Sequence, residues 1–378
     1  MFDNAYWLRD AANKAVRRAK KLVGRPDNAP WILRPPGGTR GANAYVDFIV
    51  ALDFIGNNAV LTRMFHQALS PYGLSLLIAN KHNVRRLTED LRHGRIKPHV
   101  LLDLCSACER EFGELLRVAA AAGIYTIGQP EKLERWTYKA RAQQHLEDAG
   151  LPVPPTVVIR ADQPSRELTL EERRAVGEAC VIKPSWGVAG KGVMVNVRPT
   201  RENIDAARQF DPKDDYLVQR MIKWEKLGSR SAYVRGYNVL GHRTLLWWAP
   251  ETKQYDLLTW EELQTYDLMG AIDLIDRMAR LTGMDYFSSE IAITSGAGGQ
   301  SRFVLIDYCN DQCDLNPITA QPDGLPEPWV RWACERFAEF VWRKRQGVEP
   351  APGHTVWLAN GTAAPAGDSS NVRMVTAA

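Results

Sequence analysis

The stretch "VIKPSWGVAGKGVMV", Val181–Val195, surrounds Lys191 with glycines and places another lysine, Lys183, on an apolar segment just before them. It is not a P-loop, because that motif needs four residues between its glycines and Ser or Thr after the lysine. It is not the dinucleotide fingerprint either, because an apolar β-type segment follows Gly192 where that pattern has a helix. The pattern predicts a strand, a glycine turn and a return strand. We expect a flap whose backbone N–H groups can close over a polyphosphate, with Lys183 facing the phosphates.

A glycine-rich loop by itself is more often a plain hairpin with a loose tip, so other parts of the chain decide its interpretation. Lys139 supplies a second cation near the start of a predicted helix. The segment "YLVQRMIKWE" is an apolar strand that ends in a turn with Glu225, which suits an adenine edge and a ribose hydroxyl. Glu290 and Asp307 lie on two adjacent predicted strands, and Asn310 follows them. Because Mg²⁺ prefers oxygen ligands, these three residues form a candidate metal site.

Composition places the chain among globular proteins with two or three domains, because 45% of its 378 residues are apolar and 24% are charged. The net charge is +4, and basic residues are interleaved with acidic ones, so we expect no nucleic-acid partner. No stretch approaches the roughly 18 uninterrupted apolar residues of a membrane-spanning helix. Because its start also lacks a secretory apolar segment, the sequence predicts a cytoplasmic protein without a membrane partner.

Six cysteines do not form a disulfide framework in a chain of this size, and we expect them to be thiols. They include two close pairs, Cys105/Cys108 and Cys309/Cys313, which could bind zinc if the fold brought them together. Buried structural thiols are the favoured alternative, because neither pair lies in a Gly-rich turn.

The first two predicted parts of the chain are residues 1–42 and residues 43–130. The first contains a basic amphipathic helix, Tyr6–Val23, and a loop. We expect this helix to pack on the body of the protein, with a membrane-surface helix as the alternative. The second part alternates between short apolar runs and helical periodicity, which predicts a small parallel sheet flanked by helices.

Three further parts complete the prediction. Residues 131–225 begin with a helix over 133–148, which Gly150 ends, and contain the flap. Residues 226–346 carry a hairpin that turns at Gly241, a helix over 267–283 and a second hairpin with the two acidic residues. Residues 347–378 are rich in Pro, Ala, Gly and Ser and are expected to be a flexible tail.

Three tryptophans are candidates for contact with ligands. Trp186 lies inside the flap and could cover a nucleotide or substrate when the flap closes. Trp247 and Trp248 are adjacent on a predicted strand, and we expect them to divide between the core and the substrate side.

With these segments in this order, the chain resembles the ATP-grasp superfamily, the fold of carboxylate–amine ligases such as D-alanine ligase, glutathione synthetase and the ribosomal-protein glutamate ligases. The likeness covers about residues 43–346, and "LLDLCSACEREFGELLRVAAAAGIYTIGQPEKL" looks like the family's entry into the ATP domain. The resemblance implies an α/β (α+β) fold in which a small parallel-sheet domain precedes the ATP-grasp domain.

The resemblance also implies roles for individual residues. Lys139 and Lys183 match the two family lysines that hold ATP phosphates. Arg235 looks like the arginine that meets the γ-phosphate, with Arg230 as the alternative. The other matches are the flap residues Ser185, Trp186, Gly187, Gly190 and Gly192, the adenine hinge Gln219, Met221 and Ile222, the ribose carboxylate Glu225, and the metal ligands Glu290, Asp307 and Asn310.

The sequence departs from the family pattern at two points, which indicates an unusual subfamily. Two residues separate Asp307 from Asn310 where the family commonly has one, and no Pro-Gly turn follows. Tyr138 stands where an acidic residue often precedes the first lysine.

The resemblance implies an ATP-dependent ligase with Mg²⁺ or Mn²⁺ as its metal. A carboxylate would attack the γ-phosphorus and an amine would capture the acyl phosphate, giving an amide or peptide bond, ADP and phosphate. The alternatives are a phosphotransferase of the same fold that acts on a hydroxyl, and a nucleotide-binding protein without catalysis. The expected partners are small-molecule carboxylate and amine substrates, and the sequence leaves open whether the chain forms a homo-oligomer.

Overall fold

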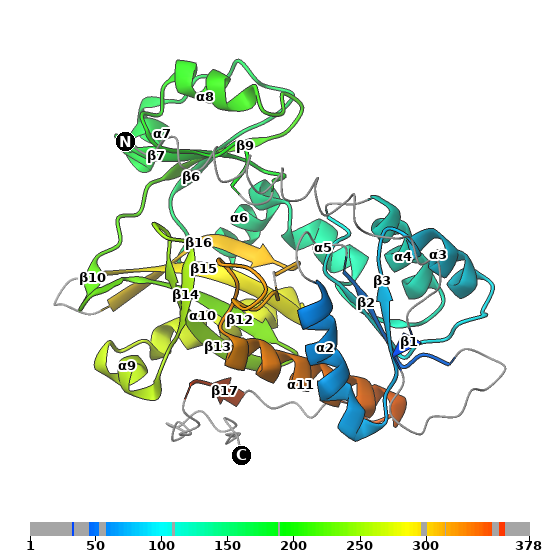
Figure 1. The fold of residues 1–378 in the computed structure, drawn as a ribbon. Coiled ribbons are helices and arrows are strands. Elements are labelled where there is room, and N and C mark those ends of the chain that lie inside the picture. Colours follow the sequence, from blue (N-terminus) through cyan, green and yellow to red (C-terminus); the bar gives the residue numbers. More distant parts are fainter. Residues whose placement is uncertain are drawn as a thin grey trace.

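The structure, a computed structural model, describes residues 32–33, 45–52, 58–107, 110–187, 190–295, 301–313, 315–349 and 355–359. The expected N-terminal helix, the flap tip at residues 188–189, Cys108 and most of the expected tail lie outside the described residues. The described residues form three larger sheets and one two-stranded ribbon, which Figure 1 shows with their helices.

The first sheet forms where short apolar segments alternate with amphipathic helices. Its strands lie in the order β1-β3-β2-β4-β5, and β2 to β5 run parallel while β1 is antiparallel to β3. Residues of β2 and β4 alternately pack against α2 on one face and against α3 and α4 on the other, as predicted for a flanked parallel sheet. The elements are β1 (Ile32–Leu33), β2 (Phe48–Ala51), α2 (Asn58–Leu69), η1 (Ser70–Tyr72), β3 (Leu76–Ala79), α3 (Val84–Arg92), β4 (Val100–Asp103), α4 (Arg110–Ala121) and β5 (Tyr125–Ile127).

The second sheet is antiparallel and contains the two strands predicted on either side of the flap. Its order is β6-β9-β7-β8, and its own apolar core lies between the sheet and helices α7 and α8. Figure 1 shows this unit at the top of the molecule, above the third sheet. The elements are β6 (Thr156–Ile159), α7 (Leu170–Val176), β7 (Cys180–Pro184), β8 (Met194–Val197), α8 (Arg201–Arg208) and β9 (Tyr216–Arg220).

Five strands of the third sheet lie in the order β14-β13-β12-β15-β16 and run antiparallel to their neighbours, and two long hairpins join neighbouring strands among them. Helix α10 packs on one face, and helix α11 packs on part of the other face. The predicted turn at Gly241 is confirmed. The elements are β12 (Tyr233–Val239), β13 (His242–Ala249), β14 (Gln254–Leu257), α9 (Trp260–Thr265), α10 (Met269–Thr282), β15 (Tyr286–Ser295), β16 (Ser301–Asn310) and α11 (Glu327–Arg345), with β10 (Lys226–Leu227) and β11 (Arg230–Ser231) forming the ribbon.

Helix α11 joins the first and third sheets into one core. Trp329 and Phe337 of this helix are fully buried and belong to the same apolar cluster as Phe48 of β2 and Tyr237 of β12. The second sheet has a separate core. Among the described residues, no helix is long and apolar enough to cross a membrane.

Two predicted elements differ from the structure. The single helix expected over 133–148 is wrong, because α5 (Pro130–Trp136) and α6 (Lys139–Asp148) are separated at Thr137 and Tyr138. Tyr138 is extended, which allows the backbone N–H of Lys139 to donate to the carbonyl of Ser185 at 3.1 Å. Tertiary hydrogen bonds to Ser185, which follows β7, are therefore made at the break between the two helices.

Part of the expected flexible tail forms regular secondary structure. Residues Thr355–Trp357 form β17, which pairs in parallel with β13. The Trp357 ring stacks on Trp332 of α11 with centroids 5.1 Å apart. An aromatic contact with a distant helix thus holds a segment that composition alone assigned to a tail.

Candidate active site

Lys183 and Asp307 meet between the second and third sheets. In β7, Cys180 and Ile182 face the core with α7 and α8, so strand alternation turns Lys183 toward the third sheet. Its Nζ donates to the carbonyl of Ile306 at 3.0 Å and lies 3.6 Å from Oδ1 of Asp307. Burial lowers the pKa of Lys183, and the Asp307 charge opposes that effect.

Lys139 stands at the first turn of α6, on the same side of the site. Its Nζ donates to the carbonyl of Gly187 at 2.8 Å, and Oγ of Ser185 accepts the backbone N–H of Ala140 at 2.8 Å. Burial by itself would raise the pKa of Asp307, but Lys139 and Lys183 lower it below its usual value. The carboxylate therefore stays ionised between two lysines that are 44 positions apart in sequence.

Arg235, Glu290 and Asp307 form a row across three strands. Arg235 lies directly opposite Glu290, and Glu290 lies directly opposite Asp307, so the three side chains share one face of the sheet. Nη1 of Arg235 lies 3.5 Å from Oε1 of Glu290, and the Tyr233 hydroxyl donates to Oε2 of Glu290 at 2.8 Å. The prediction that the two acids occupy adjacent strands is confirmed.

A β-bulge accounts for the unusual spacing between Asp307 and Asn310. Without a bulge, residues three apart would face opposite sides of the strand. Glu290 pairs with Asp307 and Ser288 pairs with Asn310, so β16 has one more residue than β15 between these two pairs. Cys309 has a left-handed φ of 55° in the bulge. The extra residue restores Asn310 to the face that carries the two acids.

The two candidate arginines have different surroundings. Arg230 forms ion pairs with Asp256 at 2.8 Å and Glu262 at 2.9 Å, on the ribbon. Arg235 donates from Nε to Ser288 at 3.0 Å and from Nη1 to the Tyr255 hydroxyl at 2.8 Å. Arg235 is the better candidate for binding an oxyanion, because it lies beside Glu290 in the row of predicted site residues.

The predicted hinge residues differ in what their side chains can reach. Gln219 is buried, and its Nε2 donates to Thr156 at 3.0 Å and to Gln143 at 3.3 Å, so its amide belongs to an internal network. The backbone N–H of Met221 donates to the carbonyl of Ala179 at 3.2 Å, and Met221 and Ile222 both follow the end of β9 at Arg220. Any contact of this hinge with a base must therefore come from other backbone groups.

Glu225, the predicted ribose carboxylate, is joined to the end of β15. It accepts the backbone N–H of Ser295 at 3.2 Å and the Ser295 hydroxyl at 2.6 Å. The side chain is exposed, so a ligand hydroxyl can compete for its oxygens.

The flap starts from a fixed base. The backbone N–H of Trp186 donates to Oδ2 of Asp214 at 2.6 Å. The residue as a whole is 48% exposed. Gly190 and Gly192 have φ of 70° and 71°, a region that L side chains rarely adopt. A Cβ at Gly192 would lie 2.5 Å from the Phe210 ring, so this glycine is also needed for space.

The donor set fits a hard divalent cation. Oδ1 of Asp307 is buried without a hydrogen-bond partner, and the Glu290 and Asn310 side chains lie on the same face of the sheet. Within the described part of the chain, no group of three or more His, Cys, Asp or Glu side chains could hold a metal. A site with two carboxylates and an amide is outside that class, and it matches the oxygen preference of Mg²⁺.

The structure gives no support to the zinc hypothesis for the residues it describes. Cys105, Cys309 and Cys313 are buried, and Cys108 lies outside the described residues. Burial raises the pKa of Cys313 to about 11, which disfavours the thiolate that zinc requires.

Sequence reasoning missed a buried network behind the lysines. The Tyr308 hydroxyl donates to Oε1 of Gln143, which also accepts from Gln219. The Tyr308 ring lies 5.5 Å from Nζ of Lys183. Gln143 follows Lys139 by one helical turn, and this spacing was the only sequence signal for the network.

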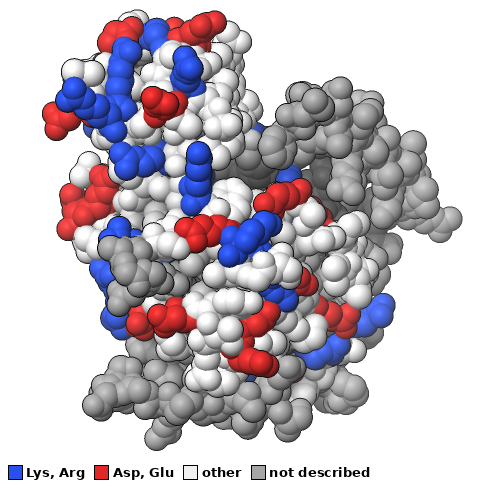
Figure 2. Space-filling model, turned by 90° about the vertical axis from the view of Figure 1, so that its left-hand side faces the viewer, with Lys and Arg blue, Asp and Glu red and all other residues white. Residues whose placement is uncertain are grey.

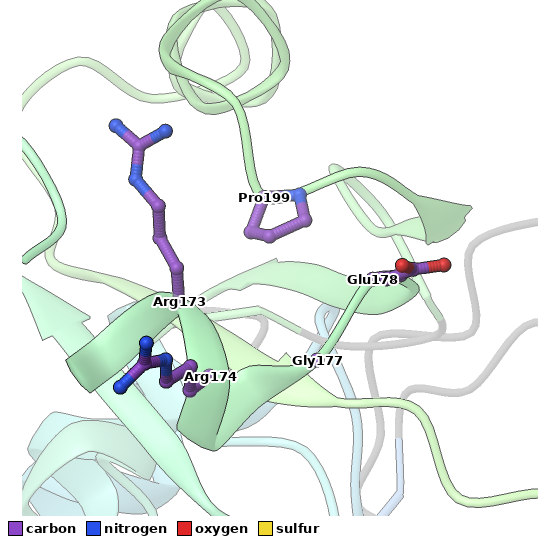
Figure 3. A pocket seen from close by; sticks show the side chains of 5 residues that line it. All are labelled: Arg173, Arg174, Gly177, Glu178 and Pro199. Carbon is purple, nitrogen blue, oxygen red and sulfur yellow. The ribbon is translucent and has the colours of Figure 1, made fainter. Parts of the chain in front are cut away.

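One surface groove lies away from the predicted site residues. A groove of about 410 Å³ is lined by Arg173, Arg174, Gly177, Glu178 and Pro199, none of which is a predicted site residue (Figure 3). Figure 2 shows basic and acidic side chains interspersed over one face of the molecule.

Comparisons with known proteins support the same fold. No family model matches the chain. A tetrahydromethanopterin:alpha-L-glutamate ligase of Methanosarcina acetivorans is 29% identical over 146 residues, which are 36% of this chain and 44% of that protein. The matched region thus spans less than half of that relative's length.

Two solved structures match most of the chain at low sequence identity. A RimK domain ATP-grasp protein from Sphaerobacter thermophilus has a TM-score of 0.55 and 15% identity, covering 78% of this chain and 99% of that one. The D-alanine–D-alanine ligase of Bacillus anthracis, complexed with ATP, has a TM-score of 0.52 and 12% identity, covering 81% and 100%. The chain therefore has the ATP-grasp fold, as the motifs in its sequence predicted.

Proposed function

We propose that the protein is an ATP-dependent ligase that activates a carboxylate as an acyl phosphate and joins it to an amine. The observation that carries this proposal is the row of Arg235, Glu290 and Asp307 on one face of the sheet. At its end, Oδ1 of Asp307 lies 3.6 Å from Nζ of Lys183. The similarity to a glutamate ligase over part of the chain supports the same class of reaction.

The charged groups suit a nucleoside triphosphate. Lys139 and Lys183 would neutralise its phosphate oxygens, and Gly187, Gly190 and Gly192 of the flap would offer backbone N–H groups to them. Ser185 and Trp186 would anchor the flap, because their own backbone N–H groups donate to Asp215 and Asp214. Phosphoryl transfer depends on positioning and charge neutralisation, which explains a site made of cations, carboxylates and backbone donors.

Glu290, Asp307 and Asn310 would hold Mg²⁺ or Mn²⁺. When bound, such an ion supplies positive charge to the β- and γ-phosphates. Oδ1 of Asp307 supports this assignment, because it accepts no hydrogen bond and has only the Lys183 ammonium, 3.6 Å away, as its charged partner, so a lone pair is available to a cation.

The adenine and ribose would lie at the other end of the second sheet. We assign backbone groups of Met221 and Ile222 to the adenine edge and the exposed carboxylate of Glu225 to the ribose. Gln219 would stabilise this hinge from inside and would not contact the adenine, since its amide is hydrogen-bonded to Gln143 and Thr156.

Two bond exchanges complete the reaction. A carboxylate oxygen forms a bond to the γ-phosphorus while the bond to the bridging oxygen breaks, which releases ADP. The amine then attacks the acyl carbon, phosphate leaves, and the amine gives up one proton. Arg235 would bind the carboxylate and the oxyanion that develops on it, while flap closure would exclude water.

The test measures ADP release across a panel of small carboxylates with hydroxylamine as the amine, together with the hydroxamate product. Arg235→Gln should lower the rate about 100-fold or more, because an oxyanion donor is lost. Arg230→Gln serves as the matched control and should stay within about threefold, because Arg230 pairs with Asp256 of β14 and Glu262 of α9 and not with the acids of the site.

Two results would contradict the proposal. One is an inactive Arg230→Gln beside an active Arg235→Gln, with both variants folded. The other is ADP release that needs an alcohol and no amine and yields a phosphorylated product, which identifies a phosphotransferase.

A further inference from the structure

A pair of aromatic rings lies beside Arg235 on the face of the sheet that carries the site. Trp248 of β13 pairs directly with Tyr255 of β14, and their ring centroids are 4.4 Å apart with an angle of 34°. Arg235 pairs with Leu246, two residues before Trp248, so Trp248 and Arg235 share one face. The rings therefore extend the row of charged residues toward the edge of the sheet.

Packing does not explain the position of Trp248. The preceding residue, Trp247, is 3% exposed and lies in the core under α10. Trp248 is only partly buried and belongs to neither of the two cores that contact this sheet. The part of this indole that remains exposed is available to a ligand on the face that carries Arg235.

The rings are attached to an anion-binding group. The Tyr255 hydroxyl accepts from Nη1 of Arg235 at 2.8 Å, and Ser288 accepts from Nε. These two bonds fix the guanidinium, and its Nη2 makes no hydrogen bond with any described residue. An anion held by Nη2 would have the aromatic surface of Tyr255 and Trp248 next to it.

Resting on the function proposed above, we infer that Trp248 and Tyr255 form the subsite for an apolar, planar body of the carboxylate substrate, whose carboxylate binds Arg235. The substrate class is an aryl or arylalkyl carboxylic acid. An amine is disfavoured at this place because a buried guanidinium repels an ammonium group and attracts a carboxylate. The short link between Arg235 and Tyr255 favours a ring separated from its carboxylate by few bonds.

The test is calorimetric binding of 3-phenylpropionate and of butyrate, with a non-hydrolysable ATP analogue and Mg²⁺ present. We expect the wild-type protein to bind 3-phenylpropionate more tightly than butyrate. Trp248→Leu should weaken 3-phenylpropionate binding about 3- to 10-fold and leave butyrate binding within about twofold. Trp248→Phe keeps a ring and should recover most of the loss.

The matched control is Trp342→Leu. Trp342 is 37% exposed and lies 5.9 Å from the Tyr72 ring, so it is also a surface tryptophan paired with a tyrosine, but it lies on α11 away from Arg235. This variant should bind both acids as the wild type does. Affinity for the ATP analogue should be equal in all variants.

The inference is overturned if 3-phenylpropionate binds no more tightly than butyrate, or if Trp248→Leu binds it as the wild type does. It is also overturned if 3-phenylpropylamine binds more tightly than the acid, or if Trp248→Leu weakens the ATP analogue by the same factor. Binding is measured without turnover, so a ligase reaction that fails with every carboxylate is seen separately in ADP release.

Discussion

Lys183 and Asp307 form an ion pair in which the lysine is more deeply buried than the carboxylate. Replacing one partner should therefore change the free energy of unfolding by a different amount than replacing the other. The Lys183 side chain is 7% exposed and that of Asp307 is 36% exposed. At 3.6 Å and an effective dielectric constant of about 20, their attraction is about 4–5 kcal/mol before solvent screening.

Asp307→Asn leaves a buried ammonium group with the Ile306 carbonyl as its remaining close acceptor. We expect this variant to lose about 2–4 kcal/mol of unfolding free energy, because an uncompensated buried charge is costly. Lys183→Met removes the buried charge and leaves a carboxylate that water can reach, so the expected loss is below about 1 kcal/mol. Both variants should lose ATP turnover, since each removes a charge at the proposed phosphate site.

Urea unfolding followed by far-ultraviolet circular dichroism measures the stability difference, and ADP release measures turnover. Lys191→Met is the control for stability, because this exposed lysine lies in the same stretch and should change stability by less than about 0.5 kcal/mol. The reasoning is refuted if Lys183→Met costs as much stability as Asp307→Asn, or if either variant turns over ATP at the wild-type rate.

Three further predictions concern the flap, acid stability and the buried network. Gly192→Ala should cost about 1–2 kcal/mol more than Gly190→Ala in urea unfolding, because both have positive φ but only Gly192 would press a Cβ against Phe210; equal losses would contradict this. Burial lowers the pKa of His242 to about 4 from 6.5, so the unfolded chain takes up the proton at a higher pH than the folded chain does. The free energy of unfolding should therefore be highest above about pH 6.5 and fall by up to about 3 kcal/mol toward pH 4. Thermal unfolding of wild type and His242→Gln should show a stability difference that changes over this range, and a constant difference would count against it. Tyr308→Phe should cost about 1 kcal/mol through its lost hydroxyl bond yet keep the KM for ATP within about twofold, because the ring remains beside Lys183; a larger rise in KM would show that the hydroxyl itself matters to nucleotide binding.

The sequence by itself determined the order of the elements and most of the charged centre. The strands around the flap and both long hairpins follow from local patterns, because alternation of side chains and turn residues acts between neighbours in the chain. Lys183 could be placed on a strand, and Glu290 and Asp307 on adjacent strands, for the same reason. Trp247 lies in the core, as one member of the pair was expected to, while the expectation that the other faces the substrate stays a prediction for the partly buried Trp248.

Only the tertiary structure decided how these pieces meet. The break before Lys139 depends on Ser185, and the return of Asn310 to the face that carries Glu290 and Asp307 depends on a bulge against β15. The choice of Arg235 over Arg230 depends on which carboxylates surround each guanidinium. Each of these features is fixed by hydrogen bonds or charges between segments far apart in the chain, and such contacts leave no periodic signal in the sequence that supplies them.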